Sequence, residues 1–426
     1  MSETHRAIEA VWRIESPKVI AALTRKVGDV GLAEDLAQEA LLAALEQWPA
    51  SGVPKNPAAW LVQVGHRRAI DQWRRKGRFD RKQGEVARDL EARQEGEVAA
   101  LDARLDDPVG DDLLGLIFLT CHPVLSTEAR VALTLRLLGG LATPEIARAF
   151  LVPEPTIAQR IVRAKRTLAE AKVPFEVPRG EALHERVGSV LEVIYLIFNE
   201  GYSATAGEDL LRPALCEDAL RLGRILAELL PAEGEVHGLV ALMELQASRF
   251  KARVGPGGAP VLLLDQDRSR WDQLLIGRGF AALARAQEGG EALGPYALQG
   301  AIAACHARAR TPEETGWPRI VALYDALAAL SPSPVVELNR AVAVAMAFGP
   351  AAGLEATDPL LKEKALRRYH LLPAVRGDLL ARLGRHADAE REFRRAAELT
   401  GNARERELLL GRASACRSLV STPPLT

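Results

Sequence analysis

The chain concentrates basic side chains in one stretch, residues 59–78, which reads AWLVQVGHRRAIDQWRRKGR. From Arg67 to Lys82 there are eight basic and two acidic residues, in a protein whose formal net charge is only -1. Guanidinium groups at this density can neutralise successive nucleic-acid phosphates, and each such contact releases a counterion. The alternative is a solvated helix face, the usual setting of a charge run. The candidates for holding a nucleic-acid strand are Arg67, Arg68, Arg74 and Arg75.

A second basic segment, residues 155–172, carries five basic residues against the single acid Glu170. It follows a short helical segment, PEIARAF, and a tight turn, LVPE, with Thr143 predicted as the helix cap and Pro144 as the first helical residue. This order predicts a helix-turn-helix, whose second helix enters the major groove. The residues placed to read base edges are Thr156, Gln159, Arg160 and Arg163. Those better placed for phosphates are Lys165 and Arg166.

An acidic stripe lies on the helix predicted for residues 32–48. Asp35, Gln38 and Glu39 share one face with Leu42. The apolar face comprises Leu32, Leu36, Ala40, Ala44 and Trp48. Carboxylates in such a row suit an arginine-rich protein partner, and a plain solvated face is the alternative.

The segment after this helix, PASGVPKNP, reads as a loop because of its prolines and glycine. Trp48 and Trp60 stand near its ends, and Lys55 and Asn56 lie within it. Opening a duplex requires a place to hold an unstacked base, which aromatic surface and free backbone amides can provide. We therefore expect the loop to receive a flipped base, with core packing of the tryptophans as the alternative.

Helices must position all of these side chains. Apolar residues recur at three- and four-residue spacing nearly throughout the 426 residues, and no stretch alternates as strands do. The predicted fold class is therefore all-α, with two small helical domains followed by a larger one. The predicted boundaries are residues 1–78, an acidic linker at 79–112, the helix-turn-helix domain at 113–172 and a C-terminal helical domain at 173–426.

The C-terminal domain contains at least one segment with the pattern of a tetratricopeptide repeat. Small residues at such positions let the two helices of a repeat touch, while large ones fill the next groove. The matching positions are Gly377, Leu380, Gly384, Ala389, Phe393 and Ala396. Two polar clusters, FNEGYSA at 198–204 and LDQDRSRWDQ at 264–273, either join this domain to the others, shape its groove, or form internal ion-paired packing.

Composition argues against several other classes of protein. The four cysteines lie far apart with no C-x-x-C pair, which favours a reducing cytoplasm over a disulfide framework. No stretch reaches about 18 uninterrupted apolar residues, so no membrane association is expected. Cys121-His122 and Cys305-His306 lack a third group at ligand spacing. We expect buried thiols and capping histidines there, and predict no metal, no cofactor and no enzyme activity.

In this order, the motifs of the first 172 residues resemble RNA polymerase sigma factors of the extracytoplasmic-function (ECF) type. AEDLAQEALLAALEQW resembles the core-binding segment, residues 57–78 the promoter-melting and minus-10 helix, and residues 125–171 the minus-35 reader. The long tail resembles that of a subgroup with a C-terminal tetratricopeptide-like extension. The family commonly has Gly-Thr-Val-x-Ser-Arg in the reader helix, whereas this chain has PTIAQR, with Pro155 and Gln159 replacing glycine and serine. Proline suits a first helical turn, so the departure does not affect the predicted fold. It affects which bases are read, because side chains near this end of the helix reach the groove.

The resemblance implies core RNA polymerase and promoter DNA as partners. Asp35, Gln38 and Glu39 would face the beta-prime clamp helices, the helix-turn-helix domain would meet the beta flap, and the tail would take a peptide or protein partner. The rival hypotheses are a tetratricopeptide-type peptide-binding scaffold and a one-component DNA-binding repressor.

Overall fold

The structure is a computed structural model that describes residues 3–77, 108–204, 206–255, 258–288, 290 and 292–421. The chain divides into two compact units, Met1–Ile194 and Tyr195–Thr426. The predicted all-α class is confirmed, because the structure is 76% helical and the described residues form almost no strands. The division falls inside one helix, later than the boundary predicted at residue 173, and the predicted linker up to residue 107 lies outside the described residues.

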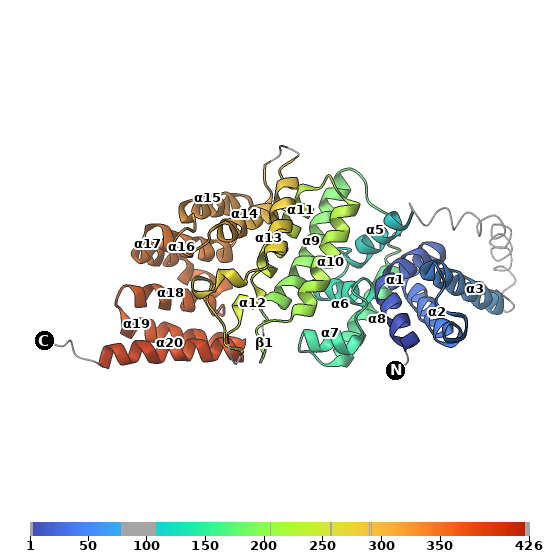
Figure 1. Ribbon diagram of the computed structural model, residues 1–426, viewed down its shortest axis with the longest axis horizontal. Helices are drawn as coiled ribbons and strands as arrows, with labels where there is room; N and C mark the ends of the chain where they lie inside the picture. The colour runs from blue at the N-terminus through green and yellow to red at the C-terminus, as the bar shows by residue number, and fades with distance from the viewer. Residues whose placement is uncertain are drawn as a thin grey trace. The chain divides into compact units, whose positions relative to one another are not determined.

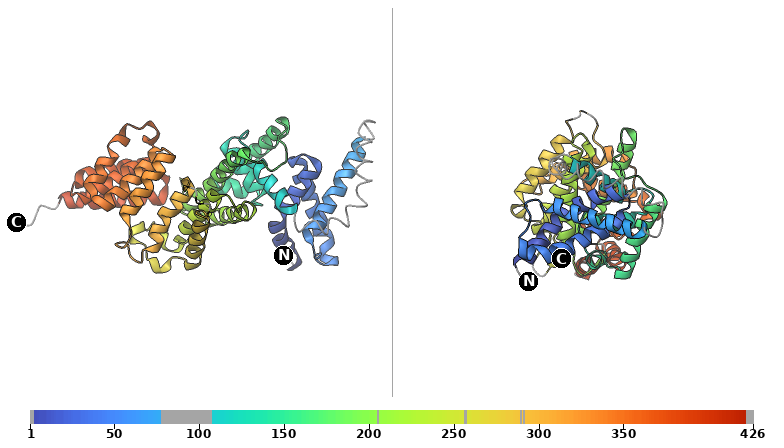
Figure 2. Two further views of the ribbon diagram at one scale, coloured as in Figure 1. Left: turned by 90° about the horizontal axis from the view of Figure 1, so that it is seen from above. Right: turned by 90° about the vertical axis from the view of Figure 1, so that its right-hand side faces the viewer.

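The first unit begins with three helices that pack against one another, as the blue ribbons show (Figure 1; Figure 2). Four more follow, and α9 begins in this unit. Their bounds are α1 Glu3–Val27, α2 Val30–Ser51, α3 Pro57–Gly77, α5 Pro108–Thr120, α6 Thr127–Leu137, α7 Thr143–Ala149, α8 Glu154–Glu170 and α9 Glu181–Tyr202. The predicted helix-turn-helix corresponds to α7 and α8, with α8 packed on both α6 and α7.

Two predicted helix ends differ from the structure. Helix α2 runs through Pro49 to Ser51 and stops at Gly52, whose φ of 79° only glycine adopts readily. Helix α7 starts at Thr143 itself, so Thr143 is not its cap. Ala142 has no side-chain oxygen, and Glu145 accepts the Ala142 backbone N–H at 2.7 Å, forming half of a capping box.

In the second unit, successive helices lie against their neighbours in chain order from α13 to α20 (Figure 1). The bounds are α10 Pro213–Leu229, α11 Gly234–Ala247, α12 Phe250–Arg253, α13 Gln273–Arg285, α14 Pro295–Arg308, α15 Trp317–Leu330, α16 Pro334–Phe348, α17 Pro350–Thr357, α18 Leu371–Arg382, α19 His386–Leu399 and α20 Ala403–Ser421. Two short strands, β1 Ala206–Gly207 and β2 Gly401–Asn402, pair in parallel.

The α18–α19 pair packs through the small and large residues that the sequence singled out. Gly377 faces the ring of Phe393, which is 1% exposed, and Gly384 takes a φ of 74° in the turn between the helices. Leu380, Ala389 and Ala396 share a core cluster with residues of α20. The name tetratricopeptide repeat remains a prediction for this pair.

The two polar clusters of the C-terminal domain form internal packing. Glu200 pairs with Arg212, and the Tyr202 hydroxyl accepts from Arg249 at 2.7 Å. Trp271 is 4% exposed beneath the guanidinium of Arg268. That guanidinium also donates to the backbone oxygens of His306 and Ala309, which satisfies carbonyls at the end of α14.

Glycine-to-alanine substitutions at Gly377, which is in close contact, and at Gly411, which is not, should have opposite effects on the free energy of unfolding. Gly377→Ala would place a Cβ 2.8 Å from the Phe393 ring, so we expect the free energy of unfolding to fall by about 1–3 kcal/mol. Gly411→Ala, on α20 with open space around it, should raise it by up to about 1 kcal/mol. Urea denaturation of the full chain measures both. Equal effects at the two sites would contradict close packing at Gly377.

Candidate nucleic-acid and polymerase interface

Helix α2 presents the predicted acidic stripe to solvent. Asp35 and Gln38 are exposed, and Leu42 beside them is 59% exposed. Glu39 is only half-exposed, because it accepts a hydrogen bond from Arg68 of α3 at 3.1 Å. The exposed surface of the stripe is therefore two polar residues and a leucine.

Helix α3 presents part of the predicted basic face. Gly65 lets it approach α1 and α2, since a Cβ there would lie 2.9 Å from a Leu23 methyl. Arg67 and Arg74 are exposed, whereas Arg68 is half-buried in its contact with Glu39. The side chain of Arg75 and all of residues 78–82 lie outside the described part of the chain.

The loop between α2 and α3 exposes polar residues but not Trp48. Lys55 and Asn56 are exposed, and Asn56 Oδ1 accepts the Ala59 N–H at 3.1 Å, a helix cap that the sequence analysis missed. Trp48 is 2% exposed and meets half-buried Trp60 edge to face, with ring centroids 5.2 Å apart. Trp48 is therefore a core residue, the alternative that the sequence left open, because its ring lacks a free face for a base.

Helix α8 exposes a narrower reading face than predicted. Gln159, Arg163 and Arg166 are exposed at spacings of four and three residues, so they share one side of the helix. Thr156 and Arg160 are half-buried. The opposite side of α8 is its core face, formed by Ile157, Ile161, Ala164 and Leu168.

Lys165 does not join this exposed face. Its ammonium group pairs with the carboxylate of Glu34 on α2, which is 5% exposed. The same carboxylate accepts from Arg136 Nε of α6 at 2.7 Å and from Gln38 at 3.0 Å. Burial by itself would raise the pKa of the Glu34 carboxyl, but Lys165 and Arg136 lower it below its ordinary value. Glu34 was not among the residues predicted from the sequence, although its position between Ala33 and Ala37 on the apolar side of the helix was a signal that this acid is buried.

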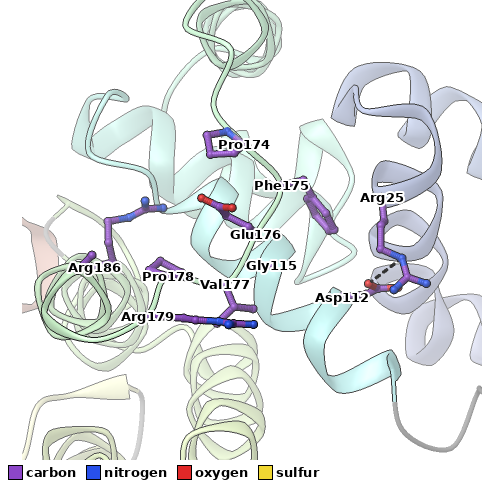
Figure 3. A pocket seen from close by; sticks show the side chains of 11 residues that line it. Arg25, Asp112, Gly115, Pro174, Phe175, Glu176, Val177, Pro178, Arg179 and Arg186 are labelled. Carbon is purple, nitrogen blue, oxygen red and sulfur yellow. Dashed lines mark ion pairs between the residues drawn. The ribbon is translucent and has the colours of Figure 1, made fainter.

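A cavity of about 750 Å³ also lies in the first unit (Figure 3). Its lining combines both charges with an aromatic ring, including Arg25, Asp112, Phe175, Glu176, Arg179 and Arg186. Arg25 and Asp112 form an ion pair at 3.2 Å, and Arg186 donates to the Phe118 carbonyl at 2.6 Å. This cavity was not predicted from the sequence.

The Cys-His pairs serve packing and turns. All four cysteines are buried and unbridged, and burial raises the pKa of the Cys216 thiol to about 12. His122 Nδ1 accepts the Val124 N–H at 3.1 Å, as a capping histidine does. Burial and two nearby arginines lower the pKa of His306 to about 3. Within the described ranges, no three His, Cys, Asp or Glu side chains gather as metal ligands would. None of the helices described there is long and apolar enough to cross a bilayer.

Comparison with known families assigns three parts of the chain. Residues 12–79 match Sigma-70 region 2, residues 115–168 match Sigma-70 region 4, and residues 186–287 match a family of unknown function, DUF6596. Region 2 thus covers α2 and α3 with the acidic stripe, and region 4 covers the helix-turn-helix. These matches define the class as a sigma-70 protein with a C-terminal extension.

The chain is also similar to proteins from two bacteria, one of which has a sigma-factor name. The chain is 45% identical over 391 residues, 91% of each protein, to the uncharacterized protein R00370 of Rhizobium meliloti. It is 28% identical over 174 residues to the "Probable ECF RNA polymerase sigma factor SigI" of Mycobacterium tuberculosis, which is 41% of this chain and 58% of that protein. The chain belongs to the sigma-70 family, as an ECF-like member that carries a C-terminal DUF6596 domain. That family points to a non-enzymatic transcription regulator.

Proposed function

We propose that the protein binds core RNA polymerase and directs promoter-specific initiation in the cytoplasm. The observation that best supports this is the location of the exposed basic residues, which fall on α3 within region 2 and on α8 within region 4. Each region therefore offers its own cationic helix to DNA, as a protein that grips two promoter elements requires.

In this proposal α2 supplies the polymerase contact. Asp35 and Gln38 offer acceptors to arginines of the beta-prime clamp helices, and Leu42 supplies apolar area one helical turn beyond them. Glu39 contributes by holding Arg68, which couples the polymerase-facing stripe to the DNA-facing helix. Region 4 would meet the beta flap.

The minus-10 element would lie along α3 and the loop before it. Arg67, Arg68, Arg74 and Arg75 hold the strand, while Lys55 and Asn56 line the place for a flipped base. Because Trp48 is buried, the ring that would contact the flipped base is that of half-buried Trp60.

The minus-35 element would be read by α8. Gln159 can pair with adenine and Arg163 with guanine, and Arg166 binds a phosphate. Thr156 and Arg160 flank this face, and Lys165 joins the phosphate contacts once it leaves Glu34.

The C-terminal helical domain would regulate or support initiation by binding a peptide or protein partner. Stacked helix pairs suit that role because they offer an extended surface with a rigid core.

Run-off transcription with purified full-length protein and core polymerase tests the proposal. Templates come from start sites mapped after overexpression, and the expected result is initiation at those sites only when the protein is present. Binding to DNA with no initiation would indicate a repressor instead. Binding to neither polymerase nor DNA would indicate a peptide-binding scaffold.

The polymerase contact makes a separate prediction. Asp35→Ala together with Leu42→Ala should weaken binding to core polymerase at least tenfold, since both side chains are exposed at the proposed interface. Fluorescence anisotropy of labelled protein titrated with core enzyme measures this. Gln47→Ala, at an exposed position about 120° around the same helix from Asp35, is the control. Unchanged polymerase affinity in the double variant would exclude this face.

A further inference from the structure

Glu34 joins region 2 to region 4. Its carboxylate on α2 contacts Arg136 of α6 and Lys165 of α8, so one buried anion holds two cations from the other region. Only 6% of its side chain is exposed, against 25% for Arg136 and 20% for Lys165. All three groups are thus largely withdrawn from water.

Other contacts join the same two regions. Helix α1 packs on α5, and Arg25 at the end of α1 pairs with Asp112, whose side chain is 7% exposed. The Lys165 stem lies beside Gly31 of α2, where an added Cβ would make an ordinary contact with its Cδ at 3.6 Å. The two regions are therefore closed on each other over several helices.

This closed arrangement conflicts with simultaneous reading of two promoter elements. Positions minus 10 and minus 35 are about 25 base pairs apart, or about 85 Å at 3.4 Å per base pair. Here α3 packs on α2, and α2 is joined to α8 through Glu34. Helix α3 has 21 residues and is therefore only about 30 Å long, so a reader packed on α2 and a reader tied to α2 by a side-chain ion pair lie well within 85 Å of each other. The readers must separate before both can engage DNA.

We propose that Glu34 is an autoinhibitory latch, a carboxylate that occupies Lys165 in place of a DNA phosphate and keeps regions 2 and 4 closed. The contact between regions 2 and 4 follows from the ion pairs and packing described above. That this contact inhibits DNA binding rests on the proposed function. Core polymerase or DNA phosphates compete for the latched groups and open the pair. The two neighbouring cations keep the Glu34 carboxyl ionised at neutral pH, so the latch is charged under ordinary conditions.

A distance measurement tests closure without relying on any activity. The full chain carries fluorophores at Gln47→Cys on α2 and Ala169→Cys on α8, both exposed positions, while the native cysteines are buried. We expect high energy transfer in this background and a clear fall with Glu34→Gln. Glu46→Gln removes the same charge from the same helix and should leave the transfer unchanged.

Lys165→Glu is a second variant that removes the Glu34–Lys165 ion pair, at a side chain that is more exposed than Glu34 and so tolerates substitution better. Circular dichroism checks that each variant is folded. If both variants fold and keep the energy transfer of Glu46→Gln, the latch is overturned.

A second measurement tests inhibition. A labelled 30-base-pair duplex of mixed sequence at low salt should bind Glu34→Gln about three- to tenfold more tightly than the parent, because Lys165 gains a phosphate contact. A fall in energy transfer with no gain in DNA affinity would keep the closure but overturn the inhibitory role. Failure of run-off transcription, with both of these results positive, would instead count against the proposed function alone.

Discussion

Reversing the charges of Arg163 and Arg166 together is expected to lower the affinity for a mixed-sequence 30-base-pair duplex by roughly 100-fold at 50 mM salt. Both side chains are exposed on one side of α8, so each variant residue replaces a phosphate or base contact with repulsion. The log-log dependence of affinity on salt should also become shallower by about two units, since about two fewer counterions are released. Anisotropy titrations across a salt series measure both quantities.

The matched control reverses two exposed arginines of the second unit, outside the region 4 match. Arg278→Glu with Arg285→Glu on α13 changes the net charge of the protein by the same amount. We expect a small, uniform loss of affinity with little change in salt slope. Equal losses in the two double variants would show that net charge, and not the face of α8, governs DNA binding.

Replacement of Trp48 by alanine should produce the largest loss of stability. The side chain is 2% exposed and packs on Trp60, so truncation removes apolar burial and leaves a cavity between α2 and α3. We expect the free energy of unfolding to fall by about 3–5 kcal/mol. For a unit of this size, that corresponds to a drop in melting temperature of roughly 6–20 °C. Thermal and urea denaturation of the full chain measure the change.

This substitution also separates the two roles considered for Trp48. Val53→Ala, at an exposed position in the adjacent loop, is the control and should change stability by less than about 0.5 kcal/mol. If Trp48→Ala retained full stability but lost promoter opening, the ring would be a base platform and the core assignment would be wrong.

Much of the site was predictable because helix periodicity is local. Helix α3, Pro57–Gly77, begins at the first residue of the segment 57–78 that was expected to form the minus-10 helix. The exposure of Asp35 and Gln38 and the shared face of Gln159 and Arg163 follow from the same 3.6-residue repeat. The helix end at Ser51 was not predicted, because a proline in the last turn loses only one hydrogen bond to the helix.

The sequence by itself determined which helices carry charge, where the helix-turn-helix lies and which residues of α18 and α19 are small enough to touch, since each depends on residue type and spacing along one segment. Only the tertiary structure decided that Trp48 is a core residue, that Arg68 is held by Glu39 and that Lys165 is bound to Glu34. These outcomes depend on which groups from distant segments meet out of water. A buried charge without a partner is energetically costly, so buried charged side chains are paired with groups of opposite charge. These partners come from distant segments, and the periodicity of one segment does not identify them.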